Sequence, residues 1–359
     1  MKVGIVGMPN AGKSSLFNAL TRAGADAANY PFTTIAPNVA VVPVADDRLD
    51  RVAETIGAAS VVPDTIDFHD IAGLVRGAHE GEGLGNRFLA NIREVDAIVH
   101  VVRAHHDASV VHPDGTVDPL RDVETVETEL VFADLEQAER RLERVVKQAR
   151  GGDRAAQAEE RWLREVVAAL QAGRPVRTVP PPVGAPRALA SLQPLTAKPV
   201  VFVANVDEGD DAVPAELAAH AAAQGARAVA VSSRLEAELA ELGDDDAAAM
   251  RVELGSAEPG LRRVVDGAFA LLDLIAFFTA GEDKPAQSWH LRRGLTAWDA
   301  AGAIHTDFKR GFVRAEVVGW EQLVDAGGYA GARERGVLRL EGRDYVMADG
   351  DVITVKFTP

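Results

Sequence analysis

The N-terminal segment Gly7–Ser14 carries residue types that suit phosphate binding. It reads GMPNAGKS: a glycine, four residues, then Gly-Lys-Ser. The glycines let backbone N–H groups turn inward around phosphate oxygens, Lys13 places a cation on the β- and γ-phosphates, and Ser14 offers a hydroxyl to Mg²⁺. The apolar run Val3–Val6 predicts a strand before this loop, and Leu16, Phe17 and Leu20 predict a helix after it. The sequence therefore predicts a nucleoside triphosphate site.

Two further stretches could complete the metal and γ-phosphate contacts. Asp70-Ile71-Ala72-Gly73 follows an apolar run, so Asp70 at a strand end can hold Mg²⁺ through water, and the Gly73 N–H can meet the γ-phosphate. Thr33 and Thr34, in the Pro-bounded segment NYPFTTIAPN, are candidates for a hydroxyl that joins the metal shell. A role for these threonines as turn residues only is the alternative.

The residues Asn205-Val206-Asp207-Glu208 follow another apolar run and are expected to face the base. A guanine site usually has the pattern Asn-Lys-x-Asp, whose Asp accepts hydrogen bonds from guanine. Here Val206 and Glu208 stand at the second and fourth positions, and Asp207 is one residue out of register. A Glu could still accept from guanine after a backbone shift, so this motif alone leaves the base open.

The residue that orients the attacking water is also altered. Ras-like GTPases use a Gln after the DxxG motif, whereas this chain has Leu74, which has no hydrogen-bonding group. His112, in the segment VVRAHHDASVVHPDG, is a candidate for a catalytic role, and a purely structural role is the alternative. His105 and His106 are weaker candidates.

The order of the elements predicts an α/β fold with an insertion. Alternating strands and helices in the first part predict a parallel sheet covered by helices. Charged residues interleaved with apolar ones at helical spacing, broken at Gly151-Gly152, then predict an antiparallel helical hairpin. The strongest strand and helix expectations are Val39–Val44, Ile66–Ile71, Ala97–Val102, Lys198–Asn205, Ala228–Ser232, a helix at Leu261–Leu274, and C-terminal strands at Ser288–Leu291, Phe312–Val318 and Val352–Phe357.

Composition limits the class of protein further. The chain has 359 residues, enough for two or three domains, and it has no cysteine, which excludes disulfides and thiolate chemistry and fits a reducing cytoplasm. Its net charge of −16 argues against coating nucleic acid, so no DNA partner is expected. There is no apolar run of about 18 residues, so no membrane partner is expected, and no signal peptide is expected before the first strand.

Five segments of the sequence together resemble those of the Obg-like ATPase family. They are GMPNAGKSS, NYPFTTIAPN, DIAGLVRGAHEGEGLGNRFLANIRE, NVDE and GAIHTDFKRGFVRAEV, and the resemblance extends over nearly the whole chain. It implies a P-loop NTPase domain of GTPase-like fold, an inserted α-helical coiled-coil hairpin, and a C-terminal TGS domain of β-grasp type. The expected boundaries are 1–121 with 198–275 for the nucleotide-binding domain, 122–197 for the insertion and 276–359 for the TGS domain.

The resemblance also implies roles for individual residues. It implies ATP as the nucleotide, with adenine read by the altered motif, and a cytoplasmic partner, the ribosome, that accelerates a slow enzyme. Mg²⁺ is the expected cofactor, and Asn10 raises the hypothesis of a K⁺ site. The implied nucleotide contacts are Asn10, Ala11, Gly12, Lys13, Ser14, Ser15, Asn205, Val206 and Glu208; the metal contacts are Ser14, Thr34 and Asp70; and the catalytic candidates are His112, Lys13 and Gly73.

The expected function is thus an ATP-hydrolysing switch that changes conformation with the state of its nucleotide. Two rivals are a GTPase of the Obg type and a nucleotide-gated adapter with negligible hydrolysis, which Leu74 makes credible. A small-molecule kinase is a third rival, and it is disfavoured because the sequence offers no acceptor pocket.

Overall fold

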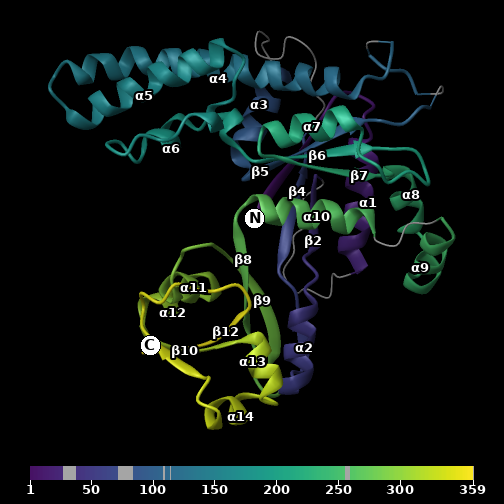
Figure 1. The fold of residues 1–359 in the computed structure, drawn as a ribbon, viewed down its shortest axis with the longest axis vertical. Coiled ribbons are helices and arrows are strands. Elements are labelled where there is room, and N and C mark those ends of the chain that lie inside the picture. The colour runs from purple at the N-terminus through teal and green to yellow at the C-terminus, as the bar shows by residue number, and fades with distance from the viewer. Residues whose placement is uncertain (27–37, 72–83, 108–109, 114, 255–258, 359) are drawn as a thin grey trace. The chain divides into compact units, whose positions relative to one another are not determined.

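The computed structural model describes residues 1–26, 38–71, 84–107, 110–113, 115–254 and 259–358 (Figure 1). The chain divides into two compact units, one of Met1–Val42 with Asp67–Leu271 and one of Pro43–Ile66 with Leu272–Pro359. Thr34, Gly73 and Leu74 fall outside the described residues. Each unit has its own sheet, described in turn below.

The sheet of the first unit has the strand order β2-β4-β1-β5-β6-β7, and the pairings β4-β1, β1-β5, β5-β6 and β6-β7 are parallel. Every residue of β5 and β6 is buried, as expected for central strands of a parallel sheet that is covered on both faces. This confirms the predicted parallel α/β fold. The strands are β1 (Lys2–Val6), β2 (Val39–Pro43), β4 (Thr65–Asp70), β5 (Ala97–Arg103), β6 (Val200–Asn205) and β7 (Arg227–Val231).

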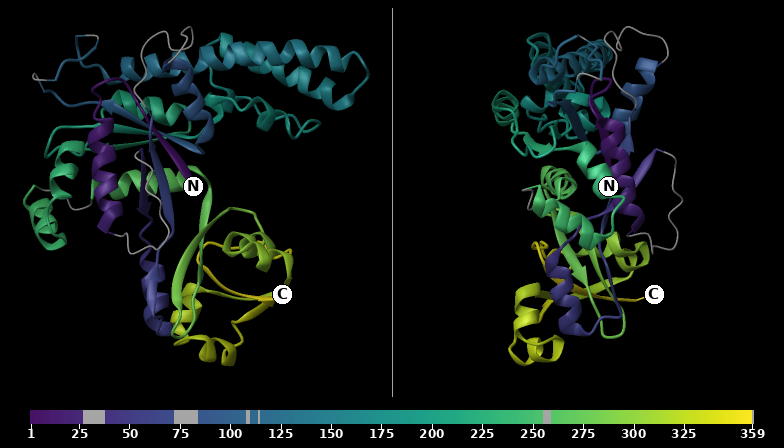
Figure 2. Two further views of the ribbon diagram at one scale, coloured as in Figure 1. Left: turned by 180° about the vertical axis from the view of Figure 1, so that it is seen from behind. Right: turned by 90° about the vertical axis from the view of Figure 1, so that its right-hand side faces the viewer.

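Helices surround this sheet (Figure 2). The predicted helix Leu261–Leu274 ends three residues early, at Leu271, and Leu274 instead begins a strand. Asp273 adopts a φ of +49°, a left-handed conformation, and separates the apolar residues at the end of the helix from those of the strand. The helices are α1 (Lys13–Asp26), α3 (Leu84–Glu94), α7 (Ala215–Ala223), α8 (Ser233–Leu239), α9 (Asp244–Glu253) and α10 (Gly260–Leu271).

The predicted helical hairpin is confirmed and extends away from the sheet (Figure 1). Asp118 caps α4 by accepting from the Arg121 N–H, and Asp153 caps α5 by accepting from the Ala155 N–H, because the first N–H groups of a helix lack partners. Trp162, Leu163 and other apolar side chains form a core between the two helices. The arm consists of α4 (Pro119–Ala149), α5 (Arg154–Gln171), η1 (Val176–Thr178), α6 (Ala188–Leu192) and η2 (Leu195–Ala197).

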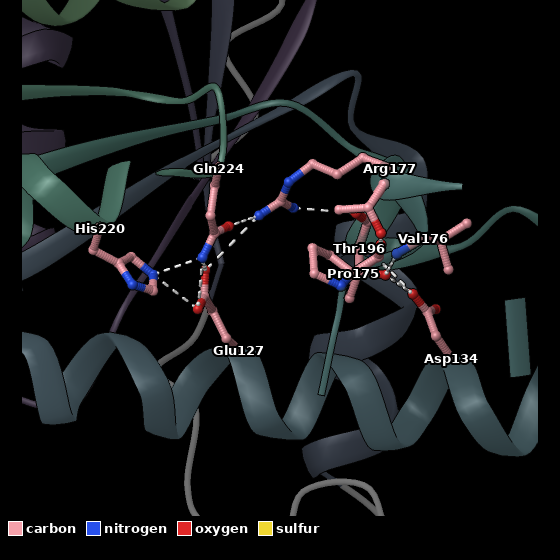
Figure 3. Close-up of polar contacts among 9 residues, drawn as sticks. Glu127, Asp134, Pro175, Val176, Arg177, Thr196, His220 and Gln224 are labelled. Atoms are coloured by element: carbon pink, nitrogen blue, oxygen red, sulfur yellow. Dashed lines mark hydrogen bonds and ion pairs between the residues drawn. The ribbon is translucent and has the colours of Figure 1, made fainter. Parts of the chain in front are cut away.

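Asp134 holds α4 to Leu195 and Thr196, which follow the helical hairpin in the sequence (Figure 3). Its buried carboxylate accepts from the Leu195 N–H at 2.8 Å, the Thr196 N–H at 2.8 Å and the Thr196 hydroxyl at 2.7 Å. Burial raises the pKa of Asp134, and these hydrogen bonds oppose the rise. Because an amide cannot accept from all three donors, Asp134→Asn is expected to lower the free energy of unfolding by about 2 kcal/mol. Urea unfolding measures it, and a change below about 0.5 kcal/mol would contradict the anchoring role.

The second unit combines residues 43–66 with the C-terminal part. Its sheet has the order β11-β10-β12-β8-β9-β3, and β3 pairs in parallel with β9. The three predicted C-terminal strands are present, and α11 packs its alanines onto the apolar face of the sheet. The elements are α2 (Asp47–Ile56), β3 (Ser60–Val62), β8 (Leu274–Thr279), β9 (Pro285–Arg292), α11 (Ala297–Ile304), α12 (Thr306–Arg310), β10 (Phe312–Gly319), α13 (Trp320–Asp325), α14 (Tyr329–Glu334), β11 (Arg339–Glu341) and β12 (Asp351–Phe357).

The two compact units do not coincide with the three expected domains. The helical hairpin groups with the parallel sheet, and residues 43–66 group with the C-terminal part. The finer division into 1–121 with 198–275, 122–197 and 276–359 therefore stays a prediction. Among the described residues, no helix is both long and apolar enough to cross a membrane.

Candidate nucleotide-binding site

The predicted phosphate loop joins β1 to α1. Gly7 has a φ of +152°, and a Cβ there would lie 2.2 Å from the carbonyl oxygen of Val101, so only glycine fits. Asn10 also has a positive φ, of 62°, which bends the loop back toward α1. Lys13 and Ser14 follow as the first residues of α1, where unpaired N–H groups and the helix dipole favour an anion.

Lys13 and Asp70 form the charged centre of the site. The Lys13 ammonium is buried and donates to the carbonyl oxygen of Met8 at 2.8 Å. Burial lowers the pKa of Lys13 and raises the pKa of Asp70, while the attraction between the two charges opposes both shifts. Each burial effect is the larger one, so both side chains lie where their charges are costly.

Asn205 connects the phosphate loop to the start of α8. Its Nδ2 donates to the carbonyl oxygen of Ala11 at 3.0 Å, and its Oδ1 accepts from the Ser233 N–H at 2.9 Å. Asn205 is buried at the carboxyl end of β6, and Ser233 begins α8 after the neighbouring β7. One side chain thus fixes the phosphate loop relative to the start of α8.

A cavity of about 890 Å³ covers this region, within the range of a nucleotide-sized pocket. It brings together most of the predicted nucleotide contacts, and it adds residues that the sequence reasoning missed. The lining consists of Asn10, Gly12, Lys13, Ser14, Ser15, Asn18, Arg22, His105, Asp107, Val110, Asn205, Val206, Asp207, Glu208, Ser232, Ser233, Arg234, Ala237, Glu238 and Glu241.

The part of the cavity lined by residues 207–241 is rich in carboxylates. Glu208 lies 3.2 Å from the Arg234 guanidinium, which also bonds Glu238 at 3.1 Å. Asp207 accepts from the His106 N–H at 3.1 Å, so its carboxylate ties two loops together. The predicted reader Glu208 therefore lines the cavity, where it forms an exposed ion pair with Arg234.

His112 occupies a different place from the other catalytic candidates. It is buried, its Nε2 lies 2.9 Å from Oδ2 of Asp122 in α4, and it is not among the described residues that line the cavity. The chain just before it nevertheless contacts the phosphate loop, because the Asn10 side chain donates to the carbonyl oxygen of Val111 at 3.0 Å. The catalytic role of His112 stays a prediction.

Mg²⁺ suits the described donors better than a metal that needs a complete protein cage. Among the described residues, no three His, Cys, Asp or Glu side chains cluster to hold a metal. Mg²⁺ usually takes only one or two protein oxygens beside phosphate oxygens and water. Ser14 and Asp70 provide such oxygens beside Lys13, whereas Thr34 lies outside the described residues.

A parallel sheet, a phosphate loop between β1 and α1, and an Asn-based contact from β6 define a P-loop nucleoside triphosphatase of the GTPase type. A family model described as a 50S ribosome-binding GTPase matches residues 2–135. A second model, YchF-GTPase_C, described as a protein of unknown function (DUF933), matches residues 274–358.

Relatives that match over nearly their whole length define the family more closely. The ribosome-binding ATPase YchF of Bacillus subtilis is 45% identical over 363 residues, and that of Haemophilus influenzae is 47% identical over 359 residues, with 99% of both chains covered in each comparison. The structure of the Schizosaccharomyces pombe YchF GTPase superposes with a TM-score of 0.88 at 36% identity, covering 99% of this chain and 97% of that one. The chain belongs to the YchF family, which confirms the predicted resemblance and fold class.

A more distant structure shares the fold. The GTP binding protein from Pyrococcus horikoshii OT3 superposes with a TM-score of 0.63 at 20% identity, and the match covers both chains completely.

Proposed function

We propose that this chain is an ATP-hydrolysing switch that binds the ribosome and changes conformation with the state of its nucleotide. The observation that carries the proposal is the cavity of about 890 Å³ in which Lys13, Ser14 and Asn205 meet. Relatives of the same length are named ribosome-binding ATPases. The absence of cysteine fits the cytoplasm, where ribosomes are found.

The described residues would have separate roles in ATP hydrolysis. The N–H groups at the start of α1 and the Lys13 ammonium would hold the β- and γ-phosphates. Ser14 and Asp70 would hold Mg²⁺, directly or through water, and the ion would neutralise charge that develops on the phosphates. Thr34, the Gly73 N–H and His112 keep their predicted roles in sensing the metal, holding the γ-phosphate and handling the attacking water.

The direct test is phosphate release by the native chain with ATP or GTP, with and without ribosomes. We expect ATP to bind more tightly than GTP and ribosomes to raise the ATP rate. Tighter GTP binding would favour the GTPase alternative. Phosphate release at background with saturating ribosomes would favour the adapter alternative, and transfer of phosphate to a small acceptor would favour a kinase.

Glu208 is expected to contribute to nucleotide selection. Its carboxylate lies in the cavity at the position that follows Asn205-Val206-Asp207, and an exocyclic amine such as that of adenine can donate to it. Glu208→Ala should weaken ATP binding about tenfold, the value of one charge-assisted hydrogen bond. Calorimetric titration measures the affinity.

Glu241→Ala is the matched control for that variant, because it removes the same charge from the cavity lining at a residue that pairs with Arg22. It should leave ATP affinity within about twofold of the native value. Equal losses in both variants would mean that Glu208 has no specific role in binding the base.

Asn10 carries the hypothesis of a K⁺ ion beside the phosphates. The side-chain nitrogen of Asn10 is used by the carbonyl oxygen of Val111, so its oxygen is oriented away from that contact. Faster turnover in K⁺ than in Na⁺ buffer is the expected result. Equal turnover in the two buffers would reject the K⁺ site and leave the ATPase proposal intact.

A further inference from the structure

Arg103 is a buried cation beside the nucleotide cavity. It is the last residue of β5, is 2% exposed, and pairs in register with Asn205 of the neighbouring β6. Ligands of open α/β sheets bind beside the carboxyl ends of the strands, where the chain leaves the sheet. Arg103 thus stands where the chain leaves β5 for the edge of the cavity.

The guanidinium of Arg103 holds the segment that follows it. Its Nη2 donates to the carbonyl oxygen of Asp107 and its Nη1 to the carbonyl oxygen of Val110, both at 2.9 Å. Both residues line the nucleotide cavity, and so does His105. His105, Asp107 and Val110 together form the β5 wall of the cavity. Because a guanidinium presents its donors in a fixed plane, the two hydrogen bonds set the positions of Asp107 and Val110 together.

The β5 wall is also tied to the two motifs between which it runs. At one end, the His106 N–H donates to the Asp207 carboxylate at 3.1 Å. At the other end, the Asn10 side chain of the phosphate loop donates to the Val111 carbonyl oxygen at 3.0 Å. Arg103 holds the wall between these two contacts, so its hydrogen bonds set how the wall lies against the rest of the cavity.

The side chains of the β5 wall suit the nucleoside part of a nucleotide. The Asp107 carboxylate repels phosphate and can accept hydrogen bonds from hydroxyl or amine groups. Burial and, to a smaller extent, the charge of Arg103 lower the pKa of His105, so its ring is neutral at neutral pH. The wall is therefore expected to contact the sugar or the base, which ATP and ADP share.

We propose, on the basis of the function proposed above, that Arg103 is a positioning residue for nucleotide binding that acts through the β5 wall. Arg103 itself is not among the described residues that line the cavity. Its hydrogen bonds hold the wall in place before the nucleotide arrives, so binding does not have to order it. Without the guanidinium, the carbonyl oxygens of Asp107 and Val110 lose their donor, and the ordering of the wall opposes binding.

Arg103→Met and Arg177→Met make a matched pair of variants. Arg177 is also a mostly buried arginine, and its guanidinium donates to the Thr196 carbonyl oxygen at 3.1 Å and to the Gln224 side chain (Figure 3). These acceptors are not among the described residues that line the nucleotide cavity. Calorimetry with Mg²⁺ measures the affinities for ATP and ADP, urea unfolding measures stability, and phosphate release with saturating ribosomes gives KM and kcat.

Arg103→Met should weaken the binding of ATP and of ADP about tenfold each, raise KM by a similar factor and keep kcat within about threefold, because the wall contacts a part of the nucleotide that does not react. Arg177→Met should lower stability but keep both affinities within about twofold of the native values. Native affinities in a folded Arg103→Met protein, a loss confined to ATP, a lower kcat with unchanged KM, or equal losses in Arg177→Met would each overturn the proposal.

Arg103→Lys keeps the experiment decisive if the methionine variant does not fold. A lysine retains the buried charge but lacks the planar pair of donors, so it cannot make both hydrogen bonds in the same geometry. It should weaken the binding of ATP and of ADP alike, by at least about threefold. Native affinity for both nucleotides would show that the charge alone is enough and would overturn the role of the two hydrogen bonds.

The ATPase proposal fails separately. If the native chain binds neither ATP nor ADP, or releases no phosphate with ribosomes, the proposed function is lost. If the native chain binds and hydrolyses ATP and the Arg103 variants bind both nucleotides like the native chain, only the positioning role is lost.

Discussion

Replacing Lys13 by alanine is expected to lower ATP hydrolysis at least about 1,000-fold, with or without ribosomes. The ammonium is buried at the start of α1, where it would contact the β- and γ-phosphates and the charge that builds up during transfer. Its removal also leaves the half-buried Asp70 without the cation that opposes the rise of its pKa. Phosphate release and calorimetric titration with ATP and Mg²⁺ provide the measurement.

Lys198→Ala is the control for that variant. Lys198 is also partly buried, burial also lowers its pKa, and its ammonium donates to the carbonyl oxygens of Arg93 and Val95, outside the nucleotide cavity. It should keep hydrolysis within about twofold of the native rate. A Lys13→Ala protein that retains more than about a tenth of native activity would contradict the assignment of the phosphate loop.

Local patterns predict the first unit of the fold well. The strands β5 and β6 were predictable because each is a short, mainly apolar run, and β4 because its apolar residues Ile66 and Phe68 alternate with polar ones. The hairpin was predictable because helical spacing continues for many turns and stops at Gly151-Gly152. In both cases the signal lies within the segment itself.

Long-range pairing is what the sequence could not provide. The segment 43–66 joins the C-terminal unit through β3, whose Ser60 pairs with Pro285, and nothing within 43–66 specifies a partner so far along the chain. The predicted end of the helix α10 was wrong, because the sequence pattern did not show where the helix ends and the next strand begins. Apolar residues stand on both sides of Asp273, and the left-handed backbone of this one polar residue separates the helix from β8.

The residues of the site also separate into those that local motifs predict and those that only the fold brings together. Lys13, Ser14, Asn205 and Glu208 were predictable because each belongs to a compact motif, and the cavity brings all four together. Arg22, Asp107, Ser232, Ser233 and Arg234 were missed because they belong to no such motif and reach the cavity through the fold. One usable signal existed: the two serines follow directly on the apolar run of β7, at the sheet edge where β6 places Asn205.

Gly12→Ala is the second large effect expected, and it tests the geometry of the loop rather than its charge. Gly12 has a φ of +99°, and a Cβ there would lie 2.1 Å from Nδ2 of Asn205. Asn205 would have to move, which breaks its hydrogen bonds to Ala11 and Ser233 and frees the phosphate loop from the start of α8. We expect ATP affinity to fall about 100-fold or more, which corresponds to roughly 3 kcal/mol.

Gly225→Ala separates this collision from backbone strain. Gly225 also has a positive φ, of 65°, but a Cβ there has nothing within 4 Å, so the alanine costs only the left-handed conformation, about 1 kcal/mol of stability. The two proteins should therefore lose similar stability from strain, and only Gly12→Ala should lose ATP. Should both bind ATP within about threefold of the native chain, Asn205 would not hold the loop and the cavity in the way these contacts require.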